Sequence, residues 1–329
     1  MKKHILIIGS GSIGQRHAYN LFSLGCKISC CDFRNDRIDE MKSKVEITNS
    51  YNSLLEAIEK NFFDGAVICT PTFFHPQQTE IIVNLGIPLL LEKPISKTLK
   101  EALKVKEVIS RKQNKILLGY TWRWWKPLLR VKKILDKNLI GNLNFVQFHM
   151  SAHLADWHPW EPYQEFFMSS KKMGGGALLD ESHWIDLMIW FFGMPKSVSG
   201  KVSKHSNLEI ETDDNVDIIC SYKNFNVTIH LDLYGRPHEK FIRFIGDDGS
   251  MMWSADPNEI SIGKTMNQDW KKETFKMERN DMFMDLAKEF IDFIRNDKPV
   301  SCNYEDGIKV MQLIEAVRES SNTGKEVKL

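Results

Sequence analysis

Lys93 is the first candidate for chemistry, because it lies two residues after a continuously apolar segment, Leu89–Leu91, that is typical of a buried parallel strand. In open α/β sheets, ligands bind beyond the carboxyl ends of the strands. An ammonium group there can hydrogen-bond a substrate hydroxyl and stabilise negative charge on its oxygen. Glu92 precedes the lysine, and Pro94 biases the lysine backbone toward an extended conformation. The alternative interpretation is a solvated pair of charges in a loop.

His183 is the second candidate, in the apolar segment that follows the glycines at 174–176. Asp180 and Asp186 lie three residues before and after it, so on one continuous helix the carboxylates would lie about 60° to either side of the imidazole. Such a histidine can be held in one tautomer and can carry a proton near neutral pH. A core histidine with satisfied hydrogen bonds is at least as good an interpretation. Zinc fits less well, because no matching Cys or His cluster lies close by, and we expect no metal site.

A third group consists of aromatic and polar side chains that could contact a sugar, which has both C–H faces and hydroxyls. Trp157, His158 and Trp160 lie in a segment rich in Trp and Pro, and an ordinary packed loop explains them equally well. Tyr120 and Arg123 follow the apolar run at 116–118 and could line the same cleft. Arg123 is a candidate for binding an anionic group of the substrate.

A glycine turn near the N-terminus is the element that could position a cofactor for these groups. Gly9, Gly11 and Gly14 form G-x-G-x-x-G between an apolar strand and a helix. The three glycines are expected to allow a tight turn, the close approach of a pyrophosphate, and the close packing of helix on strand. Ser12 and Ile13 lie at the start of the helix, whose N–H groups and dipole favour phosphate. The pattern therefore predicts a dinucleotide site.

Asp32 ends the second predicted strand, Lys27–Cys31, and lies 18 residues after Gly14, where a ribose-binding acid is expected. Its carboxylate would accept hydrogen bonds from a ribose diol and repel a 2'-phosphate. Arg34 and Arg37 lie nearby and could soften that repulsion. We therefore expect NAD(H) as the cofactor, with NADP(H) as the alternative.

The hydrophobic pattern predicts two domains, 1–121 and 122–329. In the first, short apolar runs alternate with amphipathic helices, which is typical of a parallel sheet covered by helices. In the second, residues 154–173 read as a long ordered loop and the following segment as a single helix that ends at Phe192. Alternation over 143–149, 216–221, 227–233 and 241–245 predicts antiparallel strands, and two amphipathic helices end the chain. We thus expect a Rossmann domain and an α+β domain with a large, mostly antiparallel open sheet.

Composition excludes several classes of function. The 44 basic and 43 acidic residues nearly cancel, so no global field favours nucleic acid or an anionic membrane. The six cysteines show no metal or redox spacing, and the first strand begins too early to leave room for a signal peptide. The apolar run at 184–192 is far shorter than the roughly 20 residues of a membrane span. A cytoplasmic protein without a membrane partner is expected.

In this order, the glycine turn, the Glu-Lys-Pro segment and the glycine-rich histidine helix resemble the Gfo/Idh/MocA family, the glucose-fructose oxidoreductase and inositol dehydrogenase group. Further matching segments are Cys69-Thr70-Pro71-Thr72 with His75, Gly119-Tyr120 with Arg123, and the closing helix at 305–320. The resemblance implies hydride transfer between NAD(P) and a sugar, polyol or related carbonyl compound. It also implies a homo-oligomer, a dimer or tetramer, formed through the open sheet, with the last helix able to pack back on the N-terminal domain.

The resemblance assigns roles to individual residues. Lys93 matches the catalytic lysine of the family, His183 its acid/base histidine and Asp180 the preceding acid. Many members have that acid four residues before the histidine, whereas Asp180 lies three before, and this puts its role in doubt. The acid-x-Ser-His version and the DWHPWE segment at 156–161 resemble a subgroup of surface-polysaccharide sugar enzymes. The expected cofactor-binding residues are Gly9, Gly11, Ser12, Ile13, Gly14, Asp32, Arg34, Thr70, Pro71, His75, Glu92 and Lys93.

These observations predict an NAD-dependent oxidoreductase acting on a secondary alcohol or ketone of a sugar or nucleotide-linked sugar. The predicted substrate contacts are Lys93, Tyr120, Arg123, Trp157, His158, Trp160, Asp180 and His183. One alternative is an epimerase-like enzyme that keeps its NAD(H) tightly bound. Others are a catalytically silent NAD-sensing protein and a zinc-dependent hydrolase centred on His183.

Overall fold

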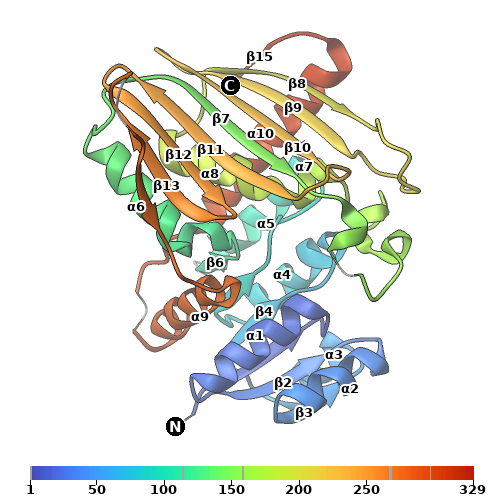
Figure 1. The fold of residues 1–329 in the computed structure, drawn as a ribbon. Helices are drawn as coiled ribbons and strands as arrows, with labels where there is room; N and C mark the ends of the chain where they lie inside the picture. The colour runs from blue at the N-terminus through green and yellow to red at the C-terminus, as the bar shows by residue number, and fades with distance from the viewer. Residues whose placement is uncertain (1, 113–114, 158, 267–268, 297) are drawn as a thin grey trace. The chain divides into compact units, whose positions relative to one another are not determined.

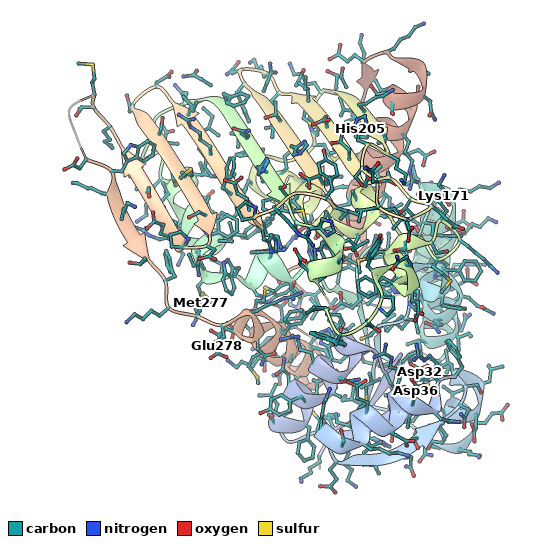
Figure 2. The ribbon with its side chains drawn as sticks, turned by 45° about the vertical axis from the view of Figure 1, so that its right-hand side comes forward. Asp32, Asp36, Lys171, His205, Met277 and Glu278 are labelled. Atoms are coloured by element: carbon teal, nitrogen blue, oxygen red, sulfur yellow. The ribbon has the colours of Figure 1, made fainter. Side chains whose placement is uncertain are left out.

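The computed structural model describes residues 2–112, 115–157, 159–266, 269–296 and 298–329. The chain divides into two compact units. The first comprises Met1–Trp124 and Glu278–Ile308, and the second comprises Trp125–Met277 and Lys309–Leu329. Figure 2 labels Met277 and Glu278, between which the chain returns to the first unit. The first unit therefore contains a late segment, 278–308, in addition to the N-terminal residues that the hydrophobic pattern assigned to it.

A six-stranded parallel sheet forms the centre of the first unit, in the order β3-β2-β1-β4-β5-β6 (Figure 1). The strand order reverses between β1 and β4, and such a switch point is where doubly wound sheets bind ligands. All five strand pairs are parallel. The strands are β1 His4–Ile8, β2 Lys27–Cys31, β3 Ile47–Tyr51, β4 Gly65–Ile68, β5 Leu89–Leu91 and β6 Ile116–Leu118.

Helices cover this sheet, and a late helix is one of them. The helices of the first unit are α1 Ser12–Ser23, α2 Asn35–Lys44, α3 Leu54–Lys60, α4 His75–Asn84, α5 Leu99–Lys112 and α9 Arg279–Asn296. Helix α9 packs on α1, where Phe283 lies edge-on to the His17 ring at 5.6 Å. At the start of β4, a Cβ at Gly65 would lie 3.2 Å from the Phe290 ring, so the sheet and α9 are in close contact. This apolar packing explains why 278–308 belongs to the first unit.

The second unit contains a nine-stranded sheet in the order β14-β13-β12-β11-β7-β10-β9-β8-β15. Among the described strands, the β7–β10 pair is parallel and the other seven pairs are antiparallel. The fold class expected from the sequence, a Rossmann domain followed by an α+β domain with a mostly antiparallel sheet, is confirmed. The strands are β7 Leu143–Ser151, β8 Ser197–Ser203, β9 Asn215–Ser221, β10 Asn226–Asp232, β11 Glu239–Gly246, β12 Gly249–Ala255, β13 Asn258–Gly263, β14 Lys271–Thr274 and β15 Val327–Lys328.

One face of this sheet is covered by helices α6 Lys126–Asp136, α7 Ala177–Asp180 and α8 Ser182–Phe192 (Figure 1). Trp184 of α8 lies against Phe148 of β7 and Trp253 of β12, with ring centroids 6.3 and 6.4 Å apart. These side chains form the core under the sheet. Helix α10, Tyr304–Thr323, begins in the first unit and ends in the second, where its Ser320 hydroxyl accepts the Gly200 N–H of β8.

The structure differs from the expected secondary structure in two places that bear on the site. The segment 177–192 forms two helices instead of one, because Glu181 leaves the helical conformation (φ −89°, ψ 18°) between α7 and α8. The loop at 154–173 contains three short 3-10 turns, at Leu154–Asp156, Tyr163–Glu165 and Phe167–Ser169. Within the ranges described above, every helix is too short or too polar to cross a membrane.

Candidate functional site

The glycine turn between β1 and α1 has the geometry of a phosphate-binding turn. Gly9 has φ +95°, which L side chains rarely adopt, and a Cβ there would lie 2.9 Å from the backbone of Cys69. A Cβ on Gly14 would overlap the Gly9 carbonyl oxygen, whereas a Cβ on Gly11 would meet no atom within 4 Å. Gly11 thus leaves open space in front of the N-terminus of α1, and as the N-cap residue it has no side chain to cap that helix. This space and the uncapped N–H groups fit a pyrophosphate.

Asp32 is held next to this turn by backbone hydrogen bonds. Its Oδ2 accepts the Ser10 N–H at 2.6 Å, and its Oδ1 accepts the Arg34 N–H at 2.9 Å. Each carboxylate oxygen has a second lone pair, so the group can also accept hydrogen bonds from a ligand diol. The structure therefore joins the end of β2 to the glycine turn, as a ribose-binding carboxylate requires.

His75 joins the loop after β4 to the turn after β5. Its Nε2 lies 2.8 Å from the Thr70 carbonyl oxygen and its Nδ1 lies 2.7 Å from the Pro94 carbonyl oxygen. The ring is 1% exposed, and burial lowers the pKa of His75. Because both ring nitrogens face backbone carbonyls, the geometry favours a positioning role over the direct cofactor contact expected from the sequence. Thr70 itself donates from Oγ1 to Gln78 at 2.6 Å.

Glu92 supports the backbone on which Lys93 is placed. Its Oε1 lies 2.8 Å from Nε2 of His17, and its Oε2 lies 3.3 Å from the Lys93 N–H. A Cβ on Gly119 would lie 2.8 Å from the Glu92 carboxyl carbon, so this glycine makes room for the carboxylate. Since His17 is 0% and Glu92 8% exposed, both are buried and their hydrogen bond is protected from water. The interpretation of Glu92 and Lys93 as a solvated charged pair therefore does not hold for Glu92.

Arg123 and Tyr120 are not placed as the sequence suggested. Arg123 is 6% exposed, and its Nη1 lies 3.3 Å from Asp306 and 3.2 Å from the Ser301 carbonyl oxygen. Its charge is neutralised within the first unit, which argues against the predicted contact with an anionic substrate group. Tyr120 is fully buried, and its predicted substrate contact is likewise disfavoured.

The break at Glu181 changes the expected geometry around His183. His183 and Asp186 share α8, whereas Asp180 is the last residue of α7. The prediction that both carboxylates flank the imidazole on one helix is therefore wrong for Asp180. Asp180 and Asp186 are 6% and 0% exposed, while His183 is partly exposed. Of the three side chains, the imidazole is the one with the greater access to a ligand.

Asp213 positions the short helix that precedes His183, a role that no pattern in the sequence indicates. Its Oδ2 accepts the Leu178 N–H at 2.8 Å and its carbonyl oxygen accepts the Ala177 N–H at 3.0 Å. Gly176 has φ +110°, and a Cβ there would overlap Oδ1 of Asp213. Burial raises the pKa of Asp213, whereas the Leu178 N–H opposes that shift. The glycine at 176 is thus required for the carboxylate to reach the helix.

The aromatic segment 157–160 follows a loop that is fixed by an ion pair. The Arg236 guanidinium binds both oxygens of Asp156, at 2.8 and 2.7 Å, and also lies 3.2 Å from Nδ1 of His153. Trp157 is partly buried and Trp160 is 74% exposed. His158 lies outside the described residues, so its predicted contact is not placed. No group of three His, Cys, Asp or Glu side chains suited to a metal occurs among the residues that are described.

Comparison with known proteins assigns both halves of the chain. Residues 3–120 match the family model described as "Oxidoreductase family, NAD-binding Rossmann fold", and residues 132–329 match "Oxidoreductase family, C-terminal alpha/beta domain". The chain belongs to the Gfo/Idh/MocA oxidoreductase family. This oxidoreductase is 22% identical over 349 residues to the scyllo-inositol 2-dehydrogenase (NADP(+)) IolW of Bacillus subtilis, covering 98% of this chain and 95% of that protein.

Solved structures share the fold of this oxidoreductase over its whole length. Levoglucosan dehydrogenase in complex with NADH and levoglucosan is 16% identical with a TM-score of 0.88, covering 100% of this chain and 99% of that one. The WlbA dehydrogenase of Bordetella pertussis in complex with NADH and UDP-GlcNAcA is 18% identical with a TM-score of 0.81, covering 100% and 98%. At these identities the likeness establishes the fold.

Proposed function

We propose that this oxidoreductase transfers a hydride between NAD(H) and a secondary alcohol or ketone of a sugar or nucleotide-linked sugar. The observation that supports this most directly is the pairing of a phosphate-binding turn at Gly9–Gly14 with a carboxylate, Asp32, tied to that turn at 2.6 Å. The carbohydrate and polyol ligands named for its relatives, levoglucosan, inositol and UDP-GlcNAcA, support the substrate class. The last of these also supports a role in surface-glycan synthesis.

The choice of NAD(H) over NADP(H) depends on this chain's own residues, because its relatives differ. The name of one relative specifies NADP(+), whereas two structural neighbours contain NADH. Asp32 places a negative charge at the end of β2, where it would accept hydrogen bonds from a ribose diol and repel a 2'-phosphate. This charge supports NAD(H).

Two side chains are proposed to act on the substrate. Lys93 would hydrogen-bond the reacting oxygen and stabilise the negative charge that develops there. His183 would take the hydroxyl proton during oxidation and return it during reduction. The bound nicotinamide supplies the acceptor or donor of the hydride.

The test is a direct search for bound and catalytic nicotinamide chemistry. The purified protein should bind NADH, seen as a change in nicotinamide fluorescence, and should reduce NAD⁺ in the presence of at least one member of a panel of sugars, polyols and UDP-sugars. Retained NADH absorbance after purification, with conversion of a sugar to its epimer, would point to the epimerase-like alternative. A protein that binds neither NADH nor NADPH would refute the proposal.

We propose that copies of the chain associate through the sheet face of the second unit opposite α8. This face contains a hollow of about 590 Å³, whose lining includes Lys201, Asp217, Thr228 and His230. A family fold with a large open sheet supports association, and analytical ultracentrifugation at several concentrations tests it. A monomer at all concentrations would contradict it.

A further inference from the structure

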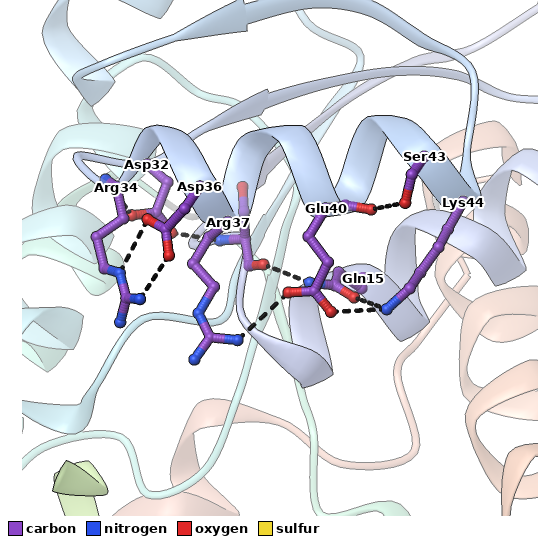
Figure 3. A network of polar contacts seen from close by, with 9 residues as sticks. Gln15, Asp32, Arg34, Asp36, Arg37, Glu40, Ser43 and Lys44 are labelled. Carbon is purple, nitrogen blue, oxygen red and sulfur yellow. Dashed lines mark hydrogen bonds and ion pairs between the residues drawn. The ribbon is translucent and has the colours of Figure 1, made fainter. Parts of the chain in front are cut away.

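A network of charged side chains surrounds the end of β2 and the first turns of α2 (Figure 3). It contains the acids Asp32, Asp36 and Glu40 and the bases Arg34, Arg37 and Lys44. Asp32 and Asp36 lie close together on this edge of the first unit, as Figure 2 also shows. If the proposed function is right, this edge receives the adenosine ribose, and its charges decide whether a 2'-phosphate is accepted.

Arg34 is the base closest in sequence to Asp32, and its guanidinium is already engaged. Its Nε lies 3.1 Å from Oδ1 of Asp36 and its Nη2 lies 2.5 Å from Oδ2, so two parallel hydrogen bonds join the fork to the carboxylate. The same planar fork is what a phosphate binds best. The hydrogen bonds from Arg34 lower the pKa of Asp36, which keeps this carboxylate charged. The edge of the Arg34 guanidinium that would bind a phosphate is therefore occupied by the Asp36 carboxylate.

The next turn of α2 has a different arrangement. Arg37 Nη1 lies 3.3 Å from Glu40, and Lys44 lies 2.8 Å from Glu40 and 2.7 Å from Gln15. Glu40 thus neutralises two bases by separate contacts, without the paired geometry seen at Asp36. This makes Glu40 a matched control for the effect of removing one negative charge from the same helix.

We propose that Asp36 is a specificity-determining residue that excludes the 2'-phosphate by holding the Arg34 fork. The inference rests on the proposed function and adds to it, because Asp32 alone would repel a 2'-phosphate while leaving Arg34 able to compensate. With Asp36 present, a 2'-phosphate would have to displace the Asp36 carboxylate from Arg34. It would also lie near the negative charges of both Asp32 and Asp36. Since the Arg34–Asp36 pair is half exposed, with side-chain exposures of 49% and 63%, it is weak enough for a single substitution to change the outcome.

The experiment measures equilibrium binding of NADH and NADPH to the full-length protein by nicotinamide fluorescence. In Asp36→Asn the side chain keeps its size but loses its charge, so Arg34 becomes able to bind a 2'-phosphate. We expect the Kd for NADPH to fall by about tenfold, which corresponds to one charge-assisted hydrogen bond to phosphate. The Kd for NADH should stay within about twofold, because the diol contact of Asp32 is retained. Thermal denaturation checks that the variant is folded.

Two controls separate release of Arg34 from a general change of charge. Glu40→Gln removes one negative charge one turn later and should leave the NADPH/NADH ratio of Kd values near that of the wild type. Adding Arg34→Ala to Asp36→Asn should abolish the gain in affinity for NADPH. The inference would be overturned by an unchanged Kd for NADPH in Asp36→Asn, or by an equal gain in NADPH affinity in either control. Binding of NADH in those experiments would still support the proposed function. Absence of NADH and NADPH binding in all proteins would overturn both.

Discussion

At the level of single residues, the turn after β5 contains a buried supporting carboxylate, Glu92, next to Lys93, the ammonium group that we propose acts on the substrate. Glu92 is buried, contacts His17 and accepts the backbone N–H of the following residue. Lys93 is partly exposed and begins the turn that His75 holds through the Pro94 carbonyl oxygen. The support is therefore built from buried hydrogen bonds, and Lys93 is a partly exposed residue of this turn.

Lys93→Ala is expected to reduce turnover by at least about 100-fold, because the developing charge on the substrate oxygen loses its stabilising ammonium. The Kd for NADH should change by no more than a few-fold, since the glycine turn and Asp32 are untouched. Steady-state kinetics and NADH titration measure the two effects. Lys97→Ala is the control, because this lysine lies four residues on with its Nζ 4.6 Å from the Phe73 ring centroid. Wild-type turnover in Lys93→Ala would remove the lysine from the mechanism.

The sequence identified residues whose role follows from local pattern, and it misplaced those whose role depends on a distant partner. The glycine spacing at 9–14 was enough to predict the turn, because each glycine acts on adjacent backbone. Arg123 was predicted to bind substrate, but its partner Asp306 lies 183 residues away. Asp213 was missed for the same reason, since the helix start it caps is 35 residues earlier in the chain.

At the level of elements, the apolar strands of the first sheet were predictable, whereas the edge strand β3 was not. β1, β4, β5 and β6 are buried apolar runs, but β3 at the sheet edge reads ITNSY and has little apolar character. The helix break at Glu181 was not predictable either. The expected helix runs through this position without a break, whereas in the structure the Glu181 carboxylate accepts a hydrogen bond from Trp184 Nε1 at 3.0 Å.

Gly176→Ala is expected to disturb the His183 helix more than an ordinary glycine substitution would. Both Gly176 and Gly193 have positive φ, 110° and 76°, so alanine at either costs about 1–3 kcal/mol of backbone strain. At Gly176 the new Cβ would also displace the Asp213 carboxylate from the start of α7, whereas at Gly193 it would meet no atom within 4 Å. The melting temperature and the turnover number should both fall further for Gly176→Ala than for Gly193→Ala. Equal effects would show that the Asp213 contact is unimportant.

The pairing of β9 with β10 carries a pH-dependent contribution to stability. His230 lies directly opposite Asp217 and contacts it at 2.7 Å, and its other ring nitrogen lies 3.1 Å from Asp232. The hydrogen bond with Asp232, followed by that with Asp217, raises the pKa of His230 to about 9. His149 stacks on the ring at 5.2 Å and adds an opposing charge when protonated, while Glu239 lies 3.5 Å from His149.

Stability from this contact is therefore fully present below about pH 6.5, where His230 is protonated in both states, and is lost as the pH rises toward 9. After allowance for solvent screening, the loss should be about 1–2 kcal/mol. In urea unfolding, the free energy of unfolding should decrease less between pH 6.5 and pH 9.5 for His230→Gln than for the wild type. Exposed His205 supplies the control substitution, which should retain the wild-type decrease. A His230→Gln protein with the wild-type pH dependence would contradict the assignment.

At the level of the whole molecule, the two proposed reactive groups belong to different units. Lys93 lies in the first unit and His183 in the second, and the chain passes between the units three times, after Trp124, Met277 and Ile308. Each unit positions its own group by internal contacts, Glu92 and His75 in one and Asp213 in the other. Neither unit therefore contains both of the groups that are proposed to act on the substrate.

A double-substitution experiment tests whether Lys93 and His183 act on the same substrate bond, as proposed. If Lys93 stabilises charge on the oxygen whose proton His183 transfers, each single alanine variant already loses most of the benefit that both provide together. Turnover of the Lys93→Ala/His183→Ala protein should then be close to that of the slower single variant, because groups that act as a unit are strongly non-additive. NADH titration of all four proteins controls for loss of cofactor binding. If the two effects instead multiply, the groups act in independent steps, and the proposal that they share one reacting bond fails.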